Sequence, residues 1–241
     1  MNLYVGTSGY SYKEWKGSFY PEKLPAKEML SYYSQRLPAV EINNTFYRLP
    51  QKTVLETWAE QVPQSFKFSV KASQRITHFK RLKDVADETK YLLETAGALE
   101  QRLGVVLFQL PPNLKKDLAR LKSFLEILPR GTRAAFEFRH PTWLDDDVLE
   151  LLTKSKQALC ISDTDDLPVS HIDGTADWGY LRLRRVNYSD ANLAEWLQRI
   201  QQQNWNDVFV FFKHEDEGTG PKLAAQFLAL AAQFLAKAKP V

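Results

Sequence analysis

The sequence of 241 residues is long enough for one large domain or two small ones. Its formal net charge of +3 at pH 7 permits an anionic partner without requiring one, and it contains no Lys/Arg run typical of a nucleic-acid-binding tail. The single cysteine, Cys160, excludes an internal disulfide framework and a thiolate-rich metal site. No segment approaches about 18 consecutive apolar residues, and no basic leader precedes the first strand. We therefore expect no signal peptide, no membrane span and a cytoplasmic location.

Apolar patterning predicts eight short strands along the chain. They fall at residues 3–5, 39–47, 66–72, 104–110, the first part of 133–143, 158–161, 179–183 and 207–214. Amphipathic spacing predicts helices at residues 26–36, 53–61, 85–101, 118–128, 148–154, 193–203 and 223–237. Between the sixth and seventh strands, residues 164–177 show no convincing long helix and are predicted to form a loop. Because Cys160 lies within an apolar run, we expect it to be a buried thiol.

This alternation of strands and helices predicts an α/β protein, with residues 1–241 forming one (β/α)8 TIM-like barrel that is irregular around its sixth unit. A doubly wound open sheet is the alternative. We favour the barrel because strands spread over the whole chain alternate polar and apolar residues, which indicates a shared interior. No linker or low-complexity tract divides the sequence.

The stretch 133–143, RAAFEFRHPTW, shows this alternation most clearly. Glu137 and Arg139 share one face of the predicted strand, and Pro141 interrupts it. A parallel strand covered on both faces is normally almost wholly apolar, so these charges must be paired or face a wet cavity. The stretch therefore indicates either a structural ion pair or a site at the carboxyl end of a strand.

Other predicted strands also carry polar residues at their carboxyl ends, which is where (β/α) barrels place their sites. We predict Glu41, Glu137 and Lys71 as catalytic residues. The predicted substrate-binding residues are Asn43, His78, Gln109, Arg139, His140, Trp143, Asp163, Arg182, Lys213 and His214. The alternation points Glu41, Lys71, Glu137, Arg139, Arg182 and Lys213 inward, whereas it places Ser162 rather than Asp163 in phase with Cys160.

The charges of this set favour an anionic ligand. Three acids, Glu41, Glu137 and Asp163, stand against four cations, Lys71, Arg139, Arg182 and Lys213. A two-metal hydrolase would need an excess of carboxylates and imidazoles, so we predict no metal and no cofactor. Arginine side chains suit phosphate and carboxylate groups geometrically.

Two carboxyl groups and one amine are the candidates for chemistry. Burial raises the pKa of a carboxyl group and a neighbouring arginine lowers it, so Glu41 and Glu137 are candidates for different acid–base roles. Lys71 is a candidate amine nucleophile, because nearby cations promote loss of its proton. The alternative for Lys71 is a salt bridge to Glu41 or Glu137. Several aromatic residues are candidates either to stack on a planar ligand or to shield the core; they are Tyr10, Tyr12, Trp15, Phe46, Tyr47 and Trp143.

Five phrases of the sequence resemble the DUF72 (YecE-like) family. They are GTSGYSY-x-x-W at 6–15, VEINNTFYRLP at 40–50, FSVKA with ITH at 68–78, LFQLPP at 107–112 and FEFRHPTW at 136–143. The resemblance implies a (β/α) barrel and assigns no reaction. Relatives have also been compared with endonuclease-IV-like barrels, which suggests DNA binding only by analogy. Many relatives carry His-Gly after the seventh strand and Asn after the eighth, whereas this chain has Arg184-Arg185 and Lys213-His214-Glu215 there.

We therefore expect acid–base chemistry, of a hydrolase or lyase, on a small anionic substrate. The first alternative is a nucleic-acid-binding or repair-related protein. In it, Arg75, Lys80, Arg81, Arg184 and Arg185 would hold phosphates. The second is a ligand-binding protein without turnover. The sequence leaves the oligomeric state open.

Overall fold

The computed structural model describes residues 1–169, 171–213 and 217–237. Eight parallel strands form a closed barrel in sequence order, as predicted. They are β1 (Asn2–Ser8), β2 (Ala39–Ile42), β3 (Lys67–Lys71), β4 (Leu103–Gln109), β5 (Ala134–Glu137), β6 (Ala158–Asp163), β7 (Trp178–Leu183) and β8 (Asp207–Phe212). Pairing of β1 with β8, from Asn2 opposite Asp207 to Thr7 opposite Phe212, closes the barrel.

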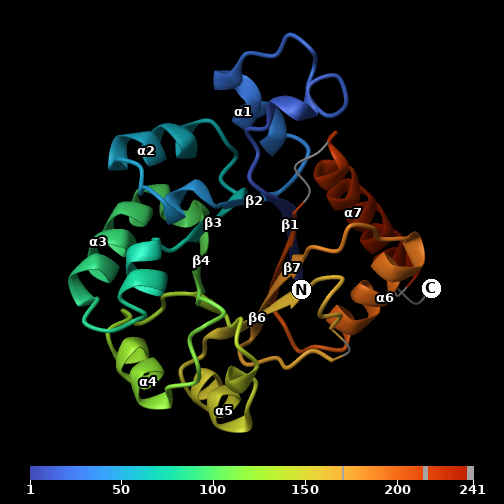
Figure 1. The fold of residues 1–241 in the computed structure, drawn as a ribbon. Helices are drawn as coiled ribbons and strands as arrows, with labels where there is room; N and C mark the ends of the chain where they lie inside the picture. Colours follow the sequence, from blue (N-terminus) through green and yellow to red (C-terminus); the bar gives the residue numbers. More distant parts are fainter. Residues whose placement is uncertain (170, 214–216, 238–241) are drawn as a thin grey trace.

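Helices surround the barrel on its outside (Figure 1). They are α1 (Met29–Ser34), α2 (Lys52–Glu60), α3 (Ala86–Ala96), α4 (Leu118–Glu126), α5 (Asp146–Lys154), α6 (Asp190–Gln201) and α7 (Thr219–Lys237). The described part of segment 164–177 contains no helix, which confirms the predicted irregularity of the sixth unit. No helix in the described ranges is long and apolar enough to cross a membrane.

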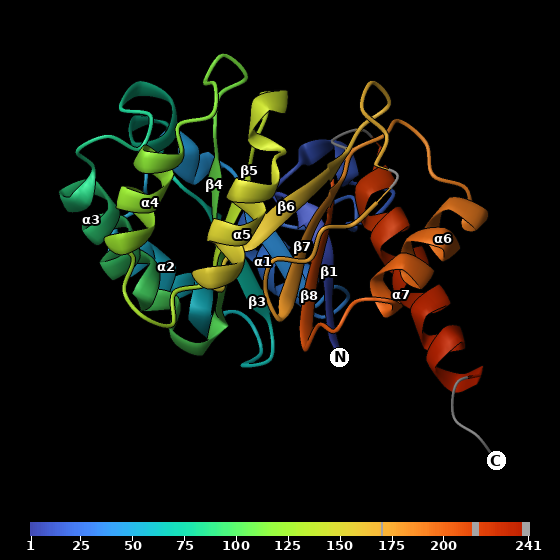
Figure 2. The ribbon, with the colours of Figure 1, turned by 90° about the horizontal axis from the view of Figure 1, so that it is seen from below.

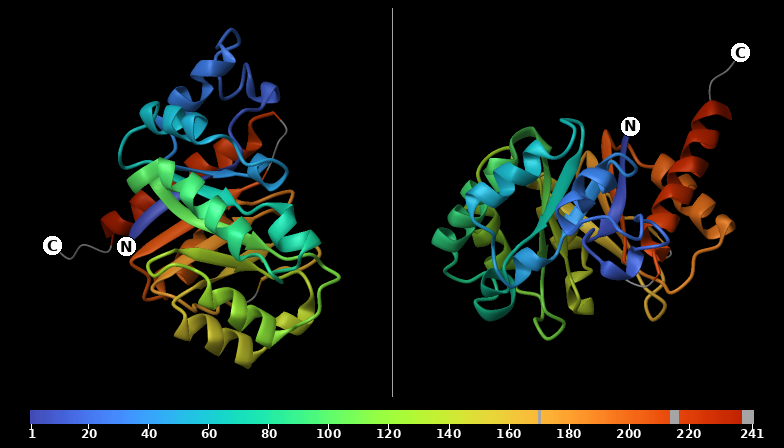
Figure 3. Two further views of the ribbon diagram at one scale, coloured as in Figure 1. Left: turned by 90° about the vertical axis from the view of Figure 1, so that its left-hand side faces the viewer. Right: turned by 90° about the horizontal axis from the view of Figure 1, so that it is seen from above.

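Figure 2 shows the segments after β4 and β6 rising above one end of the barrel, with the N-terminus at the other. The left view in Figure 3 shows α1 and the segment before it projecting from one side. Because all strands run parallel, their carboxyl ends meet at the end from which those segments rise.

The apolar core has two parts, one inside the barrel and one between the barrel and the helices. The inner part contains Ala39, Val105, Leu107, Ala135, Ala158, Cys160, Trp178, Tyr180, Phe209 and Phe211. Cys160 is buried as predicted, and burial raises the pKa of its thiol. Aromatic rings fill much of the inner space; Tyr4 stacks on Phe209 with ring centroids 4.9 Å apart.

Two local features of the sheet shape its carboxyl end. The predicted strand 39–47 was too long: β2 ends at Ile42 and a 3-10 helix follows at Asn44–Phe46. The Thr45 hydroxyl donates to the Lys71 carbonyl 2.7 Å away, an interaction that replaces further sheet pairing. In addition, β5 and β6 pair only at Ala135–Ala158 and Phe136–Leu159. The pairing between β5 and β6 is therefore the shortest in the barrel.

Gly6 provides a test of the closed barrel, because β1 and β2 approach closely there. A Cβ atom at Gly6 would lie 1.8 Å from the Ala39 carbonyl oxygen and 2.9 Å from the Tyr33 hydroxyl. We expect Gly6→Ala to lower the free energy of unfolding by about 3 kcal/mol or more, as overpacking does when backbone must move. Gly97→Ala is the matched control, because nothing lies within 4 Å of its Cβ. Equal stability of the two variants in urea unfolding would contradict the close approach.

Candidate functional site

Arg182 lies at the centre of a buried ion-pair network that joins three strands. Its Nη2 atom is 2.9 Å from Glu41 Oε1 of β2, and its Nη1 atom is 2.5 Å from Glu137 Oε2 of β5. All three side chains are almost fully buried. They stand at the carboxyl end of the barrel because each points inward near the end of its strand, as the alternation predicted.

Further donors satisfy the Glu41 carboxylate. Ser8 Oγ donates to Oε1 over 2.7 Å, Asn43 Nδ2 donates to the same oxygen over 3.0 Å, and the Tyr180 hydroxyl donates to Oε2 over 2.7 Å. Burial alone would raise the pKa of Glu41. Arg182 and the hydrogen-bond donors outweigh burial, so the pKa lies below its usual value.

Glu137 is held in the same way by groups from β4 and from the segment after β5. Gln109 Nε2 donates to Oε1 over 2.9 Å, and the Arg139 Nε and Nη2 atoms lie 2.8 and 2.7 Å from that oxygen. Arg184 Nη1 is 3.7 Å away. Burial would raise the pKa of Glu137, but Arg182 and then Arg139 hold it well below the usual range.

These directions change the expected roles of the two glutamates. We expected burial and arginine neighbours to give the two glutamates different acid–base roles, whereas the pKa values of both are lowered. Neither carboxyl group therefore retains the proton that a general acid would need at neutral pH. In this structure both are ionised partners of Arg182.

Lys71 differs from the carboxylates because no residue in the described part of the chain forms an ion pair with it. Among the described residues, no carboxylate lies within 4.0 Å of its Nζ atom, so the predicted salt bridge to Glu41 or Glu137 is wrong. The Nζ atom instead lies 4.3 Å from the centre of the Phe46 ring. Burial and then Arg182 lower the pKa of Lys71 to about 8.

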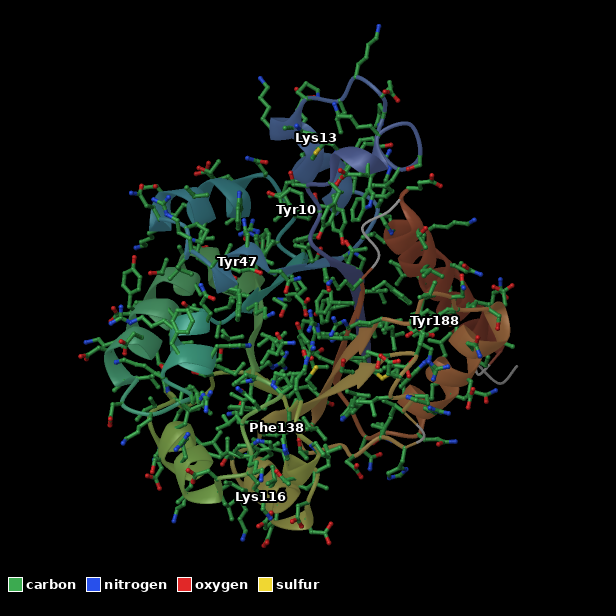
Figure 4. The ribbon with its side chains drawn as sticks, viewed as in Figure 1. Tyr10, Lys13, Tyr47, Lys116, Phe138 and Tyr188 are labelled. Carbon is green, nitrogen blue, oxygen red and sulfur yellow. The ribbon has the colours of Figure 1, made fainter. Side chains whose placement is uncertain are left out.

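A cavity of about 620 Å³ opens above this network. Seven of the predicted site residues line it: Asn43, Lys71, His78, Gln109, Arg139, Arg182 and Lys213. The remaining lining residues are Tyr12, Phe46, Tyr47, Gln74, Phe79 and Arg184. Figure 4 shows nitrogen-bearing side chains gathered near the centre of the barrel, between the labelled Tyr47, Phe138 and Tyr188. No acidic side chain of the described residues belongs to this lining.

A second cavity, of about 480 Å³, adjoins the first and shares Arg139 and Arg184 with it. His140 lines this second cavity and not the first. The second cavity lies where the pairing of β5 with β6 has stopped. His140 is therefore at the mouth as predicted, but on the side of β5 that faces β6.

Two predicted site residues of the described ranges lie elsewhere. Asp163 is buried on the outer side of β6, where its carboxylate binds Arg185 Nε and the Tyr188 hydroxyl, each over 2.8 Å. Trp143 is 1% exposed, and its ring stacks on Phe138 with centroids 4.6 Å apart. Both predictions fail because these side chains pack between the barrel and its covering segments. His214 lies outside the described residues.

Two residues that line the cavities, Arg184 and Phe79, were not among the predicted site residues. Arg184 lines both cavities, although the sequence suggested only a phosphate contact for it. The aromatic wall of the main cavity includes Phe79, which has no distinguishing pattern. By contrast, Arg75 and Lys80 both bind Glu88, over 3.0 and 2.7 Å, so these cations are already paired.

The described residues include no group of three or more His, Cys, Asp or Glu side chains placed to hold a metal ion. The carboxylates of Glu41 and Glu137, beside the cavity, both form ion pairs with Arg182.

The fold and site together define a (β/α)8 barrel protein with a cation-rich cavity at the carboxyl ends of its strands. The chain belongs to the family described as "Protein of unknown function DUF72", which matches residues 4–240. The resemblance found in the sequence is thereby confirmed.

Relatives of known sequence and structure agree with this assignment. The chain is 23% identical over 269 residues to the UPF0759 protein YunF of Bacillus subtilis (strain 168), covering 95% of this chain and 94% of YunF. It is 30% identical over 140 residues to the UPF0759 protein YecE of Escherichia coli (strain K12), covering 58% and 49%. A DUF72 family protein from Thermotoga maritima MSB8 matches with a TM-score of 0.83 and 26% identity, over 98% of this chain and 100% of that one. A DUF72 family protein from Enterococcus faecalis V583, at TM-score 0.77 and 18% identity over 95% of each chain, supports the fold alone.

Removing Arg182 should destabilise the protein strongly. Arg182→Met leaves Glu41 and Glu137 buried without their shared partner, and breaking a buried ion pair in this way costs about 3–5 kcal/mol. Arg184→Met is the matched control in the same cavity, since Arg184 is 3.7 Å from Glu137; we expect a loss below about 1 kcal/mol. Urea unfolding at pH 7 measures both. Losses of similar size would show that Arg182 is not the principal partner.

The lowered pKa of Glu137 should appear in the pH dependence of stability. The ion pair contributes fully above the unfolded-state pKa of about 4.3, and its contribution is lost as pH falls toward the lower folded-state pKa. We expect the unfolding free energy of the wild type to decline between about pH 5 and pH 3. Glu137→Gln should be less stable at pH 7 and decline less over that interval, because glutamine does not titrate. Parallel curves would contradict a lowered pKa for Glu137.

Proposed function

We propose that the main cavity binds a small anion carrying a phosphate or carboxylate group and that the protein acts on it by acid–base chemistry. The observation that carries this proposal is the charge of the cavity. Its lining includes five cationic side chains, Lys71, Arg139, Arg182, Arg184 and Lys213. Two carboxylates lie behind them, Glu41 and Glu137; both bind Arg182, and Glu137 also binds Arg139. Among the described residues of the site, cations thus outnumber carboxylates, and an anionic ligand would balance this excess.

Polar atoms near the cavity support an oxygen-rich ligand. The Nε atoms of Arg182 and Arg184 are buried without a hydrogen-bond acceptor, and Asn43 Oδ1 is buried without a donor. Buried polar groups in proteins are almost always satisfied, so such atoms mark a place for an additional partner. Guanidinium groups bind phosphate and carboxylate oxygens through pairs of hydrogen bonds, which suits Arg184; Arg139, whose Nε and Nη2 atoms bind Glu137, adds positive charge.

Lys71 is the group best suited to proton transfer in this cavity. Burial and Arg182 lower its pKa to about 8, so both its charged and its neutral form are populated near neutral pH. The arginines would stabilise negative charge that develops on the substrate. Phe46 and Tyr47 line the same cavity and offer aromatic surface to the uncharged part of a ligand.

Nucleic-acid binding is less well supported than binding of a small anion. Arg75 and Lys80 are paired with Glu88, and Arg185 is paired with Asp163. These are three of the cations that the alternative assigns to phosphates. A ligand-binding role without turnover and the expected cytoplasmic location also stay predictions.

Thermal unfolding with added ligands tests the proposed function. We expect inorganic phosphate and glycerol 3-phosphate to raise the Tm of the wild type in the presence of a chelator, because binding to the native state stabilises it. Arg139→Gln and Arg184→Gln should each weaken binding at least about tenfold, which corresponds to about 1.4 kcal/mol. Arg120→Gln, whose arginine pairs with Asp117 outside the cavity, should leave binding unchanged.

Two results would contradict this proposal. One is an unchanged Tm with every small anion, combined with binding of short single-stranded DNA that weakens steeply with salt; this would favour the nucleic-acid alternative. The other is stabilisation that disappears with chelator, which would assign the anion to a metal ion rather than to the arginines.

A further inference from the structure

We propose that the anionic ligand carries an aldehyde or ketone group and that Lys71 Nζ condenses with that carbonyl to form an imine. The proposal rests on the proposed function and specifies its substrate class. The compounds in this class are 2-oxo acids and phosphorylated aldehydes or ketones, which share an anionic group close to an electrophilic carbonyl carbon.

The surroundings of Lys71 favour a neutral amine. Charged and titratable groups face it from several elements: Glu41 on β2, His78 after β3, Glu137 on β5, Arg139 after β5 and Arg182 on β7. The carboxylates among them are 2.9 and 2.5 Å from Arg182 nitrogen atoms, while neither forms an ion pair with Lys71. Among the described residues, Lys71 thus has no ion-pair partner, and burial together with Arg182 disfavours its ammonium form more than Glu41 and Glu137 favour it. A lysine near other cations and partly removed from water is the kind that acts as an amine nucleophile.

The position of Lys71 also fits a covalent role. It is the last residue of β3, at the carboxyl end of the barrel, and it lines the same cavity as Arg139 and Arg184. The backbone there is anchored by the hydrogen bond from the Thr45 hydroxyl to the Lys71 carbonyl, 2.7 Å long. The Phe46 ring covers one side of the ammonium group at 4.3 Å. An anionic group held by the arginines would thus bring a nearby carbonyl carbon into the cavity that contains the amine.

The reaction needs no additional oxidant or reductant. The lone pair of the neutral Lys71 amine forms a bond to the carbonyl carbon, and the carbonyl oxygen takes up a proton to give a carbinolamine. The C–O bond then breaks and the oxygen leaves as water, carrying both former amine protons in the overall balance. The product is an imine, which a solvent proton converts to the iminium ion. Electron withdrawal by that ion is the usual use of such lysines in proteins that break bonds beside a carbonyl.

Reductive trapping tests this inference on the full-length chain. The protein is incubated separately with pyruvate and with dihydroxyacetone phosphate in the presence of cyanoborohydride, which reduces an imine to a stable secondary amine. We expect one adduct per chain, with peptide mapping assigning it to Lys71 on the order of tenfold or more above any other lysine. The reason is that ordinary lysines, with a pKa near 10.4, are almost entirely protonated at neutral pH. The more strongly trapped compound shows which anionic group the site takes.

Variants and unreactive analogues separate this inference from the proposed function. Lys71→Met should abolish the adduct, whereas Lys67→Met, at the opposite end of β3, should retain it. Peptide mapping of the wild type gives the answer even if Lys71→Met does not fold. Labelling spread evenly over lysines, or no adduct although glycerol 3-phosphate raises the Tm, overturns the imine and leaves the anion site standing. No stabilisation by any anion and no adduct overturns both.

Discussion

The ion pairs of Arg182 with Glu41 and Glu137 are the interaction on which the rest of the site depends. Three strands each contribute one of these charged side chains, and only a closed barrel brings β2, β5 and β7 together. Such a buried network is tolerated because its members are hydrogen-bonded, for example by Ser8, and because Glu137 receives further donors. Both carboxylates bind Arg182, and Glu137 also binds Arg139, so no carboxylate of the described residues forms an ion pair with Lys71.

The barrel interior changes from apolar to charged over a short distance. The Tyr180 ring packs against Phe211, with centroids 5.4 Å apart, while its hydroxyl donates to Glu41 over 2.7 Å. Burial raises the pKa of that hydroxyl, so it remains a donor at neutral pH. Tyr180 thus joins the hydrocarbon core to the ion pairs and fixes the floor of the cavity. Above this floor, Arg139 and Arg184 line two neighbouring cavities, the second of which lies where β5 and β6 separate.

The sequence predicted the barrel and most of the cavity because both follow from a period of two along parallel strands. The alternation predicted that Glu41, Glu137 and Arg182 point inward, and they are buried there. Their positions near strand ends predicted that they lie together at the carboxyl end of the barrel. The same alternation placed Asp163 out of phase with the inward-pointing residues, and the structure has it on the outer side of β6.

The alternation carries no information about distances between side chains on opposite strands of the barrel. The sequence therefore could not show that Arg182 forms ion pairs with both carboxylates. It also could not show that a 3-10 helix places the Phe46 ring over the Lys71 ammonium group. The prediction that Trp143 binds substrate was wrong for a related reason: burial beneath a covering loop leaves no periodic pattern in the sequence.

The most direct test of this account is an NMR titration of the lysine side chains, with the Lys71 signal assigned from its absence in Lys71→Met. If Arg182 binds both carboxylates, Lys71 has no ion-pair partner among the described residues, and we expect it to titrate with a pKa of about 8. A Lys71 pKa at or above the ordinary value of about 10.4 would mean that a carboxylate pairs with it. That result would contradict the arrangement of charges from which the anion site and its chemistry are inferred.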